Sequence, residues 1–237
     1  DALVKASSTI RDLPGAIVWI SDESHGADAI VASSKVVNID SLNDMEIFVT
    51  ENSPSEMLTL IVKDHFDIQN SKLTYLKDVN QVFEEYKNSK ISDKKAFVLW
   101  EPYVSKVLEN KDYKVLIDSE KFRDYIVDTM VASRDFLVKH PEKAKLIAEA
   151  YFTSLSKLRN SLKEELLKDA KRYGTNLTPE QIERMAKCIQ FKNTQENYAH
   201  FGLVQGHNLQ NIEIMISEII DLQLRSKSIE FNPSEMV

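Results

Sequence analysis

Short apolar runs alternate with amphipathic segments through the first half of the chain. Apolar and β-branched runs typical of buried strands occur at 15–20, 27–33, 45–50, 73–76, 96–100, 113–117 and 126–133. The intervening segments 54–66 and 78–87 repeat apolar residues with the 3.6-residue period of a helix. This strand–helix–strand order over 45–100 predicts right-handed βαβ units and a parallel sheet.

Residues 52–56 have the composition of a helix start. Ser53 is a residue type that caps helices, Pro54 suits the first helical position, and Glu56 stands where a capping box places a glutamate. Asp78 has the same capping chemistry for the second predicted helix.

Helical periodicity dominates after Arg134. Pro141 opens one long predicted helix that ends at Tyr173-Gly174, because glycine is the residue expected just past a helix end. Thr178-Pro179 starts a further helix, and 208–225 is a strongly apolar one followed by a tail. Residues 1–6 read as the last turns of a helix, so we interpret the chain as a fragment or mature form. We find no internal repeat.

Composition narrows the class of partner. The chain has 237 residues, of which 43% are hydrophobic, enough for one large core or two modest ones. A net charge of −7 argues against nucleic acid and against an anionic membrane surface, because both reward clustered lysine and arginine. No apolar run approaches the roughly 18 residues of a transmembrane helix.

Residues for catalysis or metal binding are sparse. The single cysteine, Cys188, excludes an internal disulfide and a cysteine zinc cage, and its apolar surroundings predict a buried, inert thiol. The five histidines show no metal-ligand spacing, and neither a glycine-rich phosphate loop nor a nucleophile elbow is present. We therefore expect no catalytic residue, no metal and no cofactor.

Four segments, in order along the chain, resemble one protein family. They are Ser-His-Gly-Ala-Asp-Ala-Ile-Val-Ala at 24–32, Leu-Trp-Glu-Pro-Tyr at 99–103, the Val-Asp and Ser-Arg-Asp-Phe-Leu…His-Pro-Glu elements within 126–142, and Asn…Phe-Gly at 197–202. Each resembles the corresponding segment of the SsuA/TauA/NMT1-like substrate-binding proteins of ABC importers, which are type II periplasmic binding proteins. The similarity covers nearly the whole chain.

The resemblance implies a two-lobed α/β clamshell that closes on a ligand, each lobe a largely parallel sheet flanked by helices, with a helical carboxyl-terminal region. Residues 45–120 would form the second lobe, inserted in a first lobe made of 1–44 and 121–237. The family's amino end, roughly 60 residues in two βα units, has no counterpart here. The implied protein is periplasmic or otherwise extracytoplasmic, and its partners are a small-molecule ligand and an ABC permease. It would reach the membrane only through that permease or a lipid anchor.

Two candidate parts of the ligand site lie in loops. The turn after the strand at 15–20 supplies Asp22, Ser24, Gly26 and Asp28. In open α/β folds the carboxyl ends of strands face the ligand crevice; the alternative is a solvated acidic turn. The helix start supplies Asn52, Ser53 and Ser55, whose free N–H groups suit an anion. Ordinary capping by Ser53 explains the same residues.

The remaining candidates come from the apolar runs. Trp100 is either a stacking platform for a planar ligand or hinge packing. Glu101 is a ligand partner or a hinge acceptor. Asp128 interrupts an apolar run, where a buried carboxylate needs backbone amides or a ligand amine.

The balance of these candidates is acidic. We therefore expect a ligand with an amine, amidine or ring N–H, as in the pyrimidine-precursor branch of the family, rather than a bare sulfonate. Two alternatives remain open: a ligand-sensing domain of the same fold in a signalling protein, and an enzyme related to the fungal pyrimidine synthases that share the fold.

Overall fold

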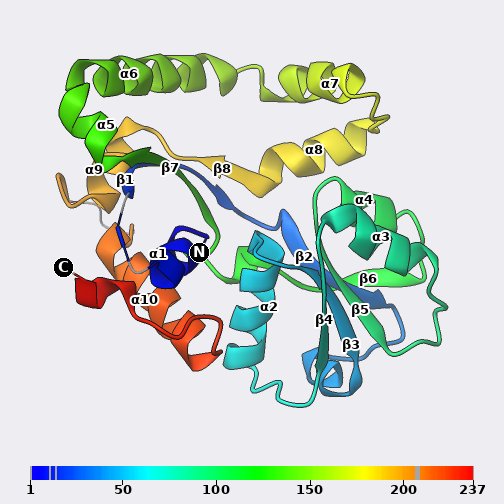
Figure 1. Ribbon diagram of the computed structural model, residues 1–237. Coiled ribbons are helices and arrows are strands. Elements are labelled where there is room, and N and C mark those ends of the chain that lie inside the picture. Colours follow the sequence, from blue (N-terminus) through cyan, green and yellow to red (C-terminus); the bar gives the residue numbers. More distant parts are fainter. Residues whose placement is uncertain (1, 11, 14, 206–208, 237) are drawn as a thin grey trace.

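Two lobes, each built on its own β-sheet, make up the chain in Figure 1. The computed structural model describes residues 2–10, 12–13, 15–205 and 209–236. The large lobe contains a five-stranded sheet of order β4-β3-β5-β2-β6, and the small lobe a three-stranded sheet of order β7-β1-β8.

The strands are β1 (Gly15–Ser24), β2 (Asp28–Ser33), β3 (Glu46–Thr50), β4 (Lys72–Leu76), β5 (Lys95–Trp100), β6 (Tyr113–Asp118), β7 (Val127–Ser133) and β8 (Ile189–Phe191). The α-helices are α1 (Ala2–Ile10), α2 (Pro54–His65), α3 (Val79–Lys87), α4 (Tyr103–Val107), α5 (Arg134–Lys139), α6 (Pro141–Leu158), α7 (Leu162–Arg172), α8 (Pro179–Cys188), α9 (Thr194–His200) and α10 (Ile212–Arg225). Short 3-10 helices are η1 (Ile39–Asp44), η2 (Ser119–Lys121) and η3 (Pro233–Met236).

Both faces of the five-stranded sheet are covered. Successive residues of a strand point to opposite faces, so Ile30 and Val98 pack toward α2 in one cluster. Val31 and Phe97 pack toward α3 and α4 in another. This explains why these strands read as continuous apolar runs rather than as alternating ones.

The lobes also share a core. Ile219 and Ile220 of α10 and Val4 of α1 belong to the same apolar cluster as α2 and the five-stranded sheet. In Figure 1, α1 and α10 lie beside α2, while α6 and α7 run along the far side of the small lobe and α8 returns beneath them. Among the described residues, no helix is both long and apolar enough to cross a membrane.

The predicted mixed α/β class is confirmed, and each predicted strand corresponds to an observed one. Strand directions differ in part: β3 is parallel to β4 and β5, but β2 is antiparallel to both of its neighbours. The three-stranded sheet is antiparallel throughout, not largely parallel as expected. In addition, β2 pairs in the five-stranded sheet, so the chain passes between sheets at 24–28 and not at 44.

The long helix predicted from Pro141 to Tyr173 is two helices. α6 ends at Leu158 and α7 begins at Leu162, separated by Arg159, Asn160 and Ser161. Asparagine and serine favour turns over helix interiors, and the Arg159 side chain bonds the carbonyl of Phe191 at 2.8 Å. The turn allows α7 to pack against α8. The predicted helix 208–225 is observed from Ile212; its expected first residue lies outside the described residues.

We predict that Leu58→Ala lowers the free energy of unfolding by about 2–5 kcal/mol, because Leu58 is fully buried between α2 and the sheet. Urea denaturation measures this. Val138→Ala, at a residue 80% exposed, is the matched control and should change the same quantity by less than about 0.5 kcal/mol. Similar losses in both variants would contradict the assignment of the core.

Candidate functional site

Three strand ends meet at one edge of the five-stranded sheet. β3 and β5 are parallel and end at Thr50 and Trp100, and the antiparallel β2 begins beside them, with Asp28 opposite Trp100. Because β5 lies between β2 and β3, Asp28 and the end of β3 are two strand spacings apart, about 10 Å. The structure therefore brings together three of the predicted regions: the Asp28 loop, Trp100 and the start of α2.

The chain crosses between the sheets twice, at 24–28 and at 118–127, and the crossings are hydrogen-bonded to each other. The Ser119 hydroxyl accepts from the Gly26 N–H at 2.7 Å and lies 2.8 Å from the Ser24 hydroxyl. The Ser24 N–H donates to the carbonyl of Ile126 at 2.9 Å. Gly26 has φ of +88°, a conformation that favours glycine. Ser24 and Gly26 thus have a structural role at this junction.

Asp28 is the most unusual polar residue of the site. Its side chain is 4% exposed; one carboxylate oxygen accepts from the Ser24 hydroxyl at 2.7 Å, and the other has no hydrogen-bond partner. Burial raises the pKa of Asp28 to about 6; the Ser24 hydrogen bond opposes the shift and the nearby charge of Asp128 adds to it. A buried, half-satisfied carboxylate is costly, so it provides a driving force for binding an N–H donor.

Asp22 and Asp128 complete an acidic cluster with Asp28. They lie opposite each other on β1 and β7. Burial, followed by repulsion from Asp128, raises the pKa of Asp22 to about 6, while Lys192 opposes the shift. The expectation that Asp128 is a buried carboxylate is wrong: it is exposed, because β7 is an edge strand.

A buried ion pair stands beside this cluster. Lys192 donates to Glu23 at 2.6 Å, and the other Glu23 oxygen accepts the Asp124 N–H at 2.9 Å. Burial opposes ionisation of Glu23, but the Lys192 and Asp124 hydrogen bonds outweigh it and hold its pKa below the usual range. The ion pair joins β1 to the residue that follows β8, and the Asp124 N–H bond joins β1 to the second crossing. Both oxygens of Glu23 therefore have partners within the chain, unlike those of Asp28.

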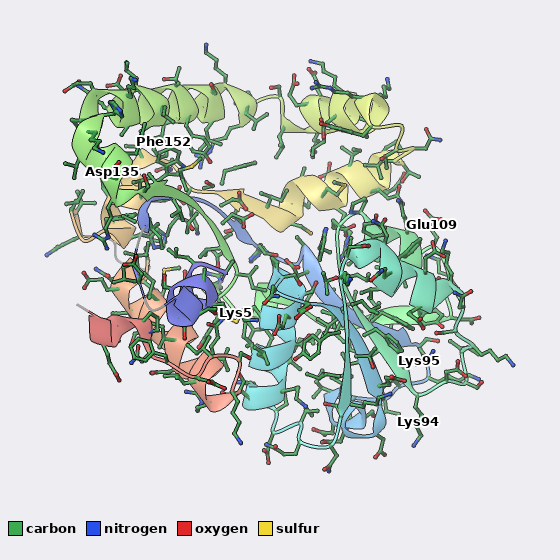
Figure 2. All side chains as sticks on the ribbon, in the orientation of Figure 1. Lys5, Lys94, Lys95, Glu109, Asp135 and Phe152 are labelled. Atoms are coloured by element: carbon green, nitrogen blue, oxygen red, sulfur yellow. The ribbon has the colours of Figure 1, made fainter. Side chains whose placement is uncertain are left out.

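The start of α2 is capped as predicted by Ser53, whose hydroxyl oxygen accepts from the Glu56 N–H at 3.3 Å. The reciprocal bond differs from a capping box, because the Glu56 carboxylate accepts from the N–H of Asn52 (2.6 Å) and not of Ser53. Lys5 of α1 reaches this turn, 2.8 Å from Glu56 and 3.3 Å from the Asn52 side-chain oxygen (Figure 2). The Ser55 hydroxyl is fully buried and has no partner.

Glu101 is already engaged within the chain. Its buried carboxylate pairs with Arg184 of α8 and accepts the Ser105 N–H at 3.1 Å. Gln181 of the same helix donates to Glu109 at 2.9 Å. These side-chain contacts hold α8 against the large lobe, and Glu101 links the two lobes through its ion pair with Arg184. Its predicted contact with a ligand stays a prediction.

Several residues around the site carried no signal in the sequence. Lys5, Ser119, Arg184 and Lys192 reach it from distant segments, and only Ser119 stands near a predicted strand end. Cys188 is buried as predicted, and burial raises the pKa of its thiol to about 11, so at neutral pH it is an unactivated thiol. Among the described residues, no group of three metal-ligating side chains comes together.

A separate groove of about 850 Å³ lies between α6, α9 and β1. Apolar rings line much of it, among them Trp19, Phe152 and Tyr198. Trp19 packs against Tyr151 and Phe152, at ring-centroid distances of 5.1 and 5.9 Å, so this groove belongs to the packing of α6 on the small sheet. It shares no residue with the acidic cluster.

The arrangement of two sheets joined by paired crossings defines the periplasmic-binding-protein fold, and solved structures of that fold match nearly the whole chain. The periplasmic aliphatic sulphonate binding protein SsuA from Escherichia coli matches with a TM-score of 0.71 and 14% identity, over 99% of this chain and 72% of that one. The alkanesulfonate-binding protein SsuA from Xanthomonas axonopodis pv. citri, bound to MOPS, matches with a TM-score of 0.72 and 14% identity, over 99% and 76%.

An enzyme also shares the fold. The desulfurization enzyme DszB matches with a TM-score of 0.59 and 9% identity, over 100% of this chain and 80% of its own. No protein-family model matches the sequence, and no curated protein matches it significantly. At these identities the likeness establishes the fold.

We predict that Asp28→Asn stabilises the protein at pH 8 by about 1–3 kcal/mol. The pKa of Asp28 is raised in the folded state. Its contribution to the free energy of unfolding is therefore fully present below its unfolded-state pKa near 3.8 and is lost as pH rises through about 6. The gain from the substitution should therefore shrink toward pH 4. Urea unfolding across this pH range measures it, with exposed Asp44→Asn as control; a pH-independent difference would contradict the assignment.

Proposed function

We propose that this chain is an extracytoplasmic solute-binding protein that captures a small organic ligand between its lobes and delivers it to an ABC importer. The observation that carries the proposal is the unpartnered oxygen of buried Asp28, at the junction where both crossings meet. The likeness to SsuA proteins and to other binding proteins of import systems supports it.

The protein would recognise its ligand by matching polar groups, and no reaction would take place. Asp22, Asp28 and Asp128 form a negative end that suits an amine, amidine or ring N–H, and Trp100 lies beside Asp28 at the end of β5. The start of α2, with the unpartnered hydroxyl of Ser55, lies along the same sheet edge and suits an acceptor or anionic group on the same ligand. Amine-, pyrimidine- and sulfonate-type ligands are thus distinguished by which end they engage.

Closure follows from where these groups lie. Asp22 and Asp128 belong to the small sheet, while Asp28, Trp100 and Ser55 belong to the large lobe. Only a closed state makes both sets of contacts, so a bound ligand shifts the population toward closure. The closed form is the one that would dock on a permease.

Binding is favoured over catalysis by the state of the reactive groups. Cys188 is buried with a raised thiol pKa, and no group of three metal-ligating side chains comes together among the described residues. A sensor domain would use the same capture step and differ only in its partner.

We predict that isothermal titration detects cytosine or a primary amine more strongly than a simple alkanesulfonate of the same size. Asp28→Asn should weaken binding of the N–H ligand roughly 10- to 100-fold, since a hydrogen bond to a charged group contributes about 1.5–3 kcal/mol. Asp44→Asn is the matched control. Tight sulfonate binding with no response to amines or pyrimidines would overturn the ligand class.

Binding of a cationic ligand should also weaken as pH falls through about 6. Protonation of Asp22 and Asp28, both with pKa raised to about 6 by burial, removes the charges that attract the ligand. Titrations with a primary amine at pH 8 and pH 5 measure the effect, and the amine stays protonated at both. Equal affinity at the two pH values would exclude these carboxylates as the amine's partners.

A further inference from the structure

α8 connects the two lobes by polar contacts. The helix ends directly before β8, which pairs with β1 in the small sheet. Earlier in the same helix, Arg184 pairs with Glu101, and Gln181 donates to Glu109 at 2.9 Å. Both carboxylates belong to the large lobe, beside α4, and Figure 1 shows α8 extending from β8 to the side of α4. The helix is therefore attached to both lobes.

The lobes also meet elsewhere, through an apolar contact. Val4 of α1 and Ile219 and Ile220 of α10 are buried in the cluster that contains α2 and the large sheet. Separating this contact would expose buried hydrocarbon to water, at a cost that grows with the apolar area exposed. The shared core therefore favours keeping α1 and α10 packed on the large lobe.

The contact made by α8 is of a different kind, because water can replace it. The Arg184 side chain is 34% exposed, whereas that of Glu101 is 5% exposed. The second Glu101 oxygen accepts the Ser105 N–H at 3.1 Å, so Glu101 keeps one partner within the large lobe when Arg184 leaves. Exchanging protein hydrogen bonds for bonds to water has a small net cost. We therefore expect the lobes to separate more readily at α8 than at the shared core.

This contact lies at the edge of the proposed ligand site. Glu101 directly follows Trp100 at the end of β5, and Trp100 lies opposite Asp28 on β2. The Glu101 N–H donates to the carbonyl of Ala27, the residue before Asp28, at 3.0 Å. Movement of α8 away from Glu101 would therefore uncover the large lobe next to Asp28.

We propose that Arg184 and Gln181 are positioning residues, which with Glu101 and Glu109 form a polar latch that holds the lobes together at α8. The lobes open by releasing this latch, while the shared apolar core stays packed. The latch favours the closed population even without ligand, and its release gives access to Asp28. The latch itself does not depend on which ligand binds; only its effect on ligand affinity rests on the proposed function.

Double electron–electron resonance between nitroxide labels on α3 and α7 tests the proposal. The labels are attached through Lys87→Cys and Lys168→Cys, at side chains 46% and 67% exposed, and the native Cys188 is buried. Without ligand, we expect the shorter of two distances to dominate. Arg184→Gln should raise the ratio of the longer to the shorter distance roughly tenfold or more, since a hydrogen bond to a charged group is lost. Arg184→Lys keeps the charge and should have a smaller effect.

Two further variants separate the latch from a general loss of structure. Glu109→Ala removes the second contact but leaves Gln181 free to cap α8, and it should shift the distances in the same direction as Arg184→Gln. Lys187→Gln is the matched control, because Lys187 is 74% exposed and pairs with Glu183 of the same helix. Circular dichroism verifies that each variant folds. Unchanged distances in both latch variants, or an equal shift in Lys187→Gln, would overturn the proposal.

Titration with a primary amine separates this proposal from the proposed function. Arg184→Gln should weaken amine binding by up to about tenfold, because a smaller closed population lowers the apparent affinity. If the distances shift but no variant binds an amine, the latch is supported and the proposed ligand class fails. If the distances do not shift, the latch is excluded whatever the amine does.

Discussion

The structure depends on the hydrogen bonds between the two crossings of the chain. The Ser119 hydroxyl accepts a hydrogen bond from the Gly26 N–H and lies within hydrogen-bond distance of the Ser24 hydroxyl. The Ser24 hydroxyl in turn donates to Asp28. These bonds fix where β1 leaves the small sheet and where β2 enters the large one. They also hold Asp28 at the junction with one oxygen unpartnered. The same few bonds thus define the hinge and the most polar point of the proposed crevice.

The lobes differ in how much of their apolar surface is covered. Both faces of the large sheet are covered, by α2 on one side and by α3 and α4 on the other. In the small lobe, β7 and α6 expose apolar residues, and α1 and α10 pack on the large lobe's core instead of on the small sheet alone. Most of the shared apolar core therefore lies in the large lobe, and the exposed apolar residues of β7 and α6 lie in the small lobe.

Local patterns in the sequence predicted the elements well because their causes are local. The Ser53-Pro54 helix start and the apolar run before Trp100 are observed where expected. Pairing between distant strands left no comparable signal: nothing local shows that β2 runs antiparallel to β5 or that β7 ends a sheet. For that reason Asp128, in an apolar run, was expected to be buried and is exposed. Glu101 likewise has a partner, Arg184, that only tertiary structure brings near.

The proposed ligand site depends on Asp28, a buried carboxylate with one oxygen that has no hydrogen-bond partner. Carbon-detected NMR of the Asp28 carboxyl group as a function of pH tests it directly. We predict a pKa near 6 in the free protein, set chiefly by burial, and a clear fall in that pKa when an amine ligand is bound. An ordinary pKa near 3.8 that an added amine leaves unchanged would contradict it.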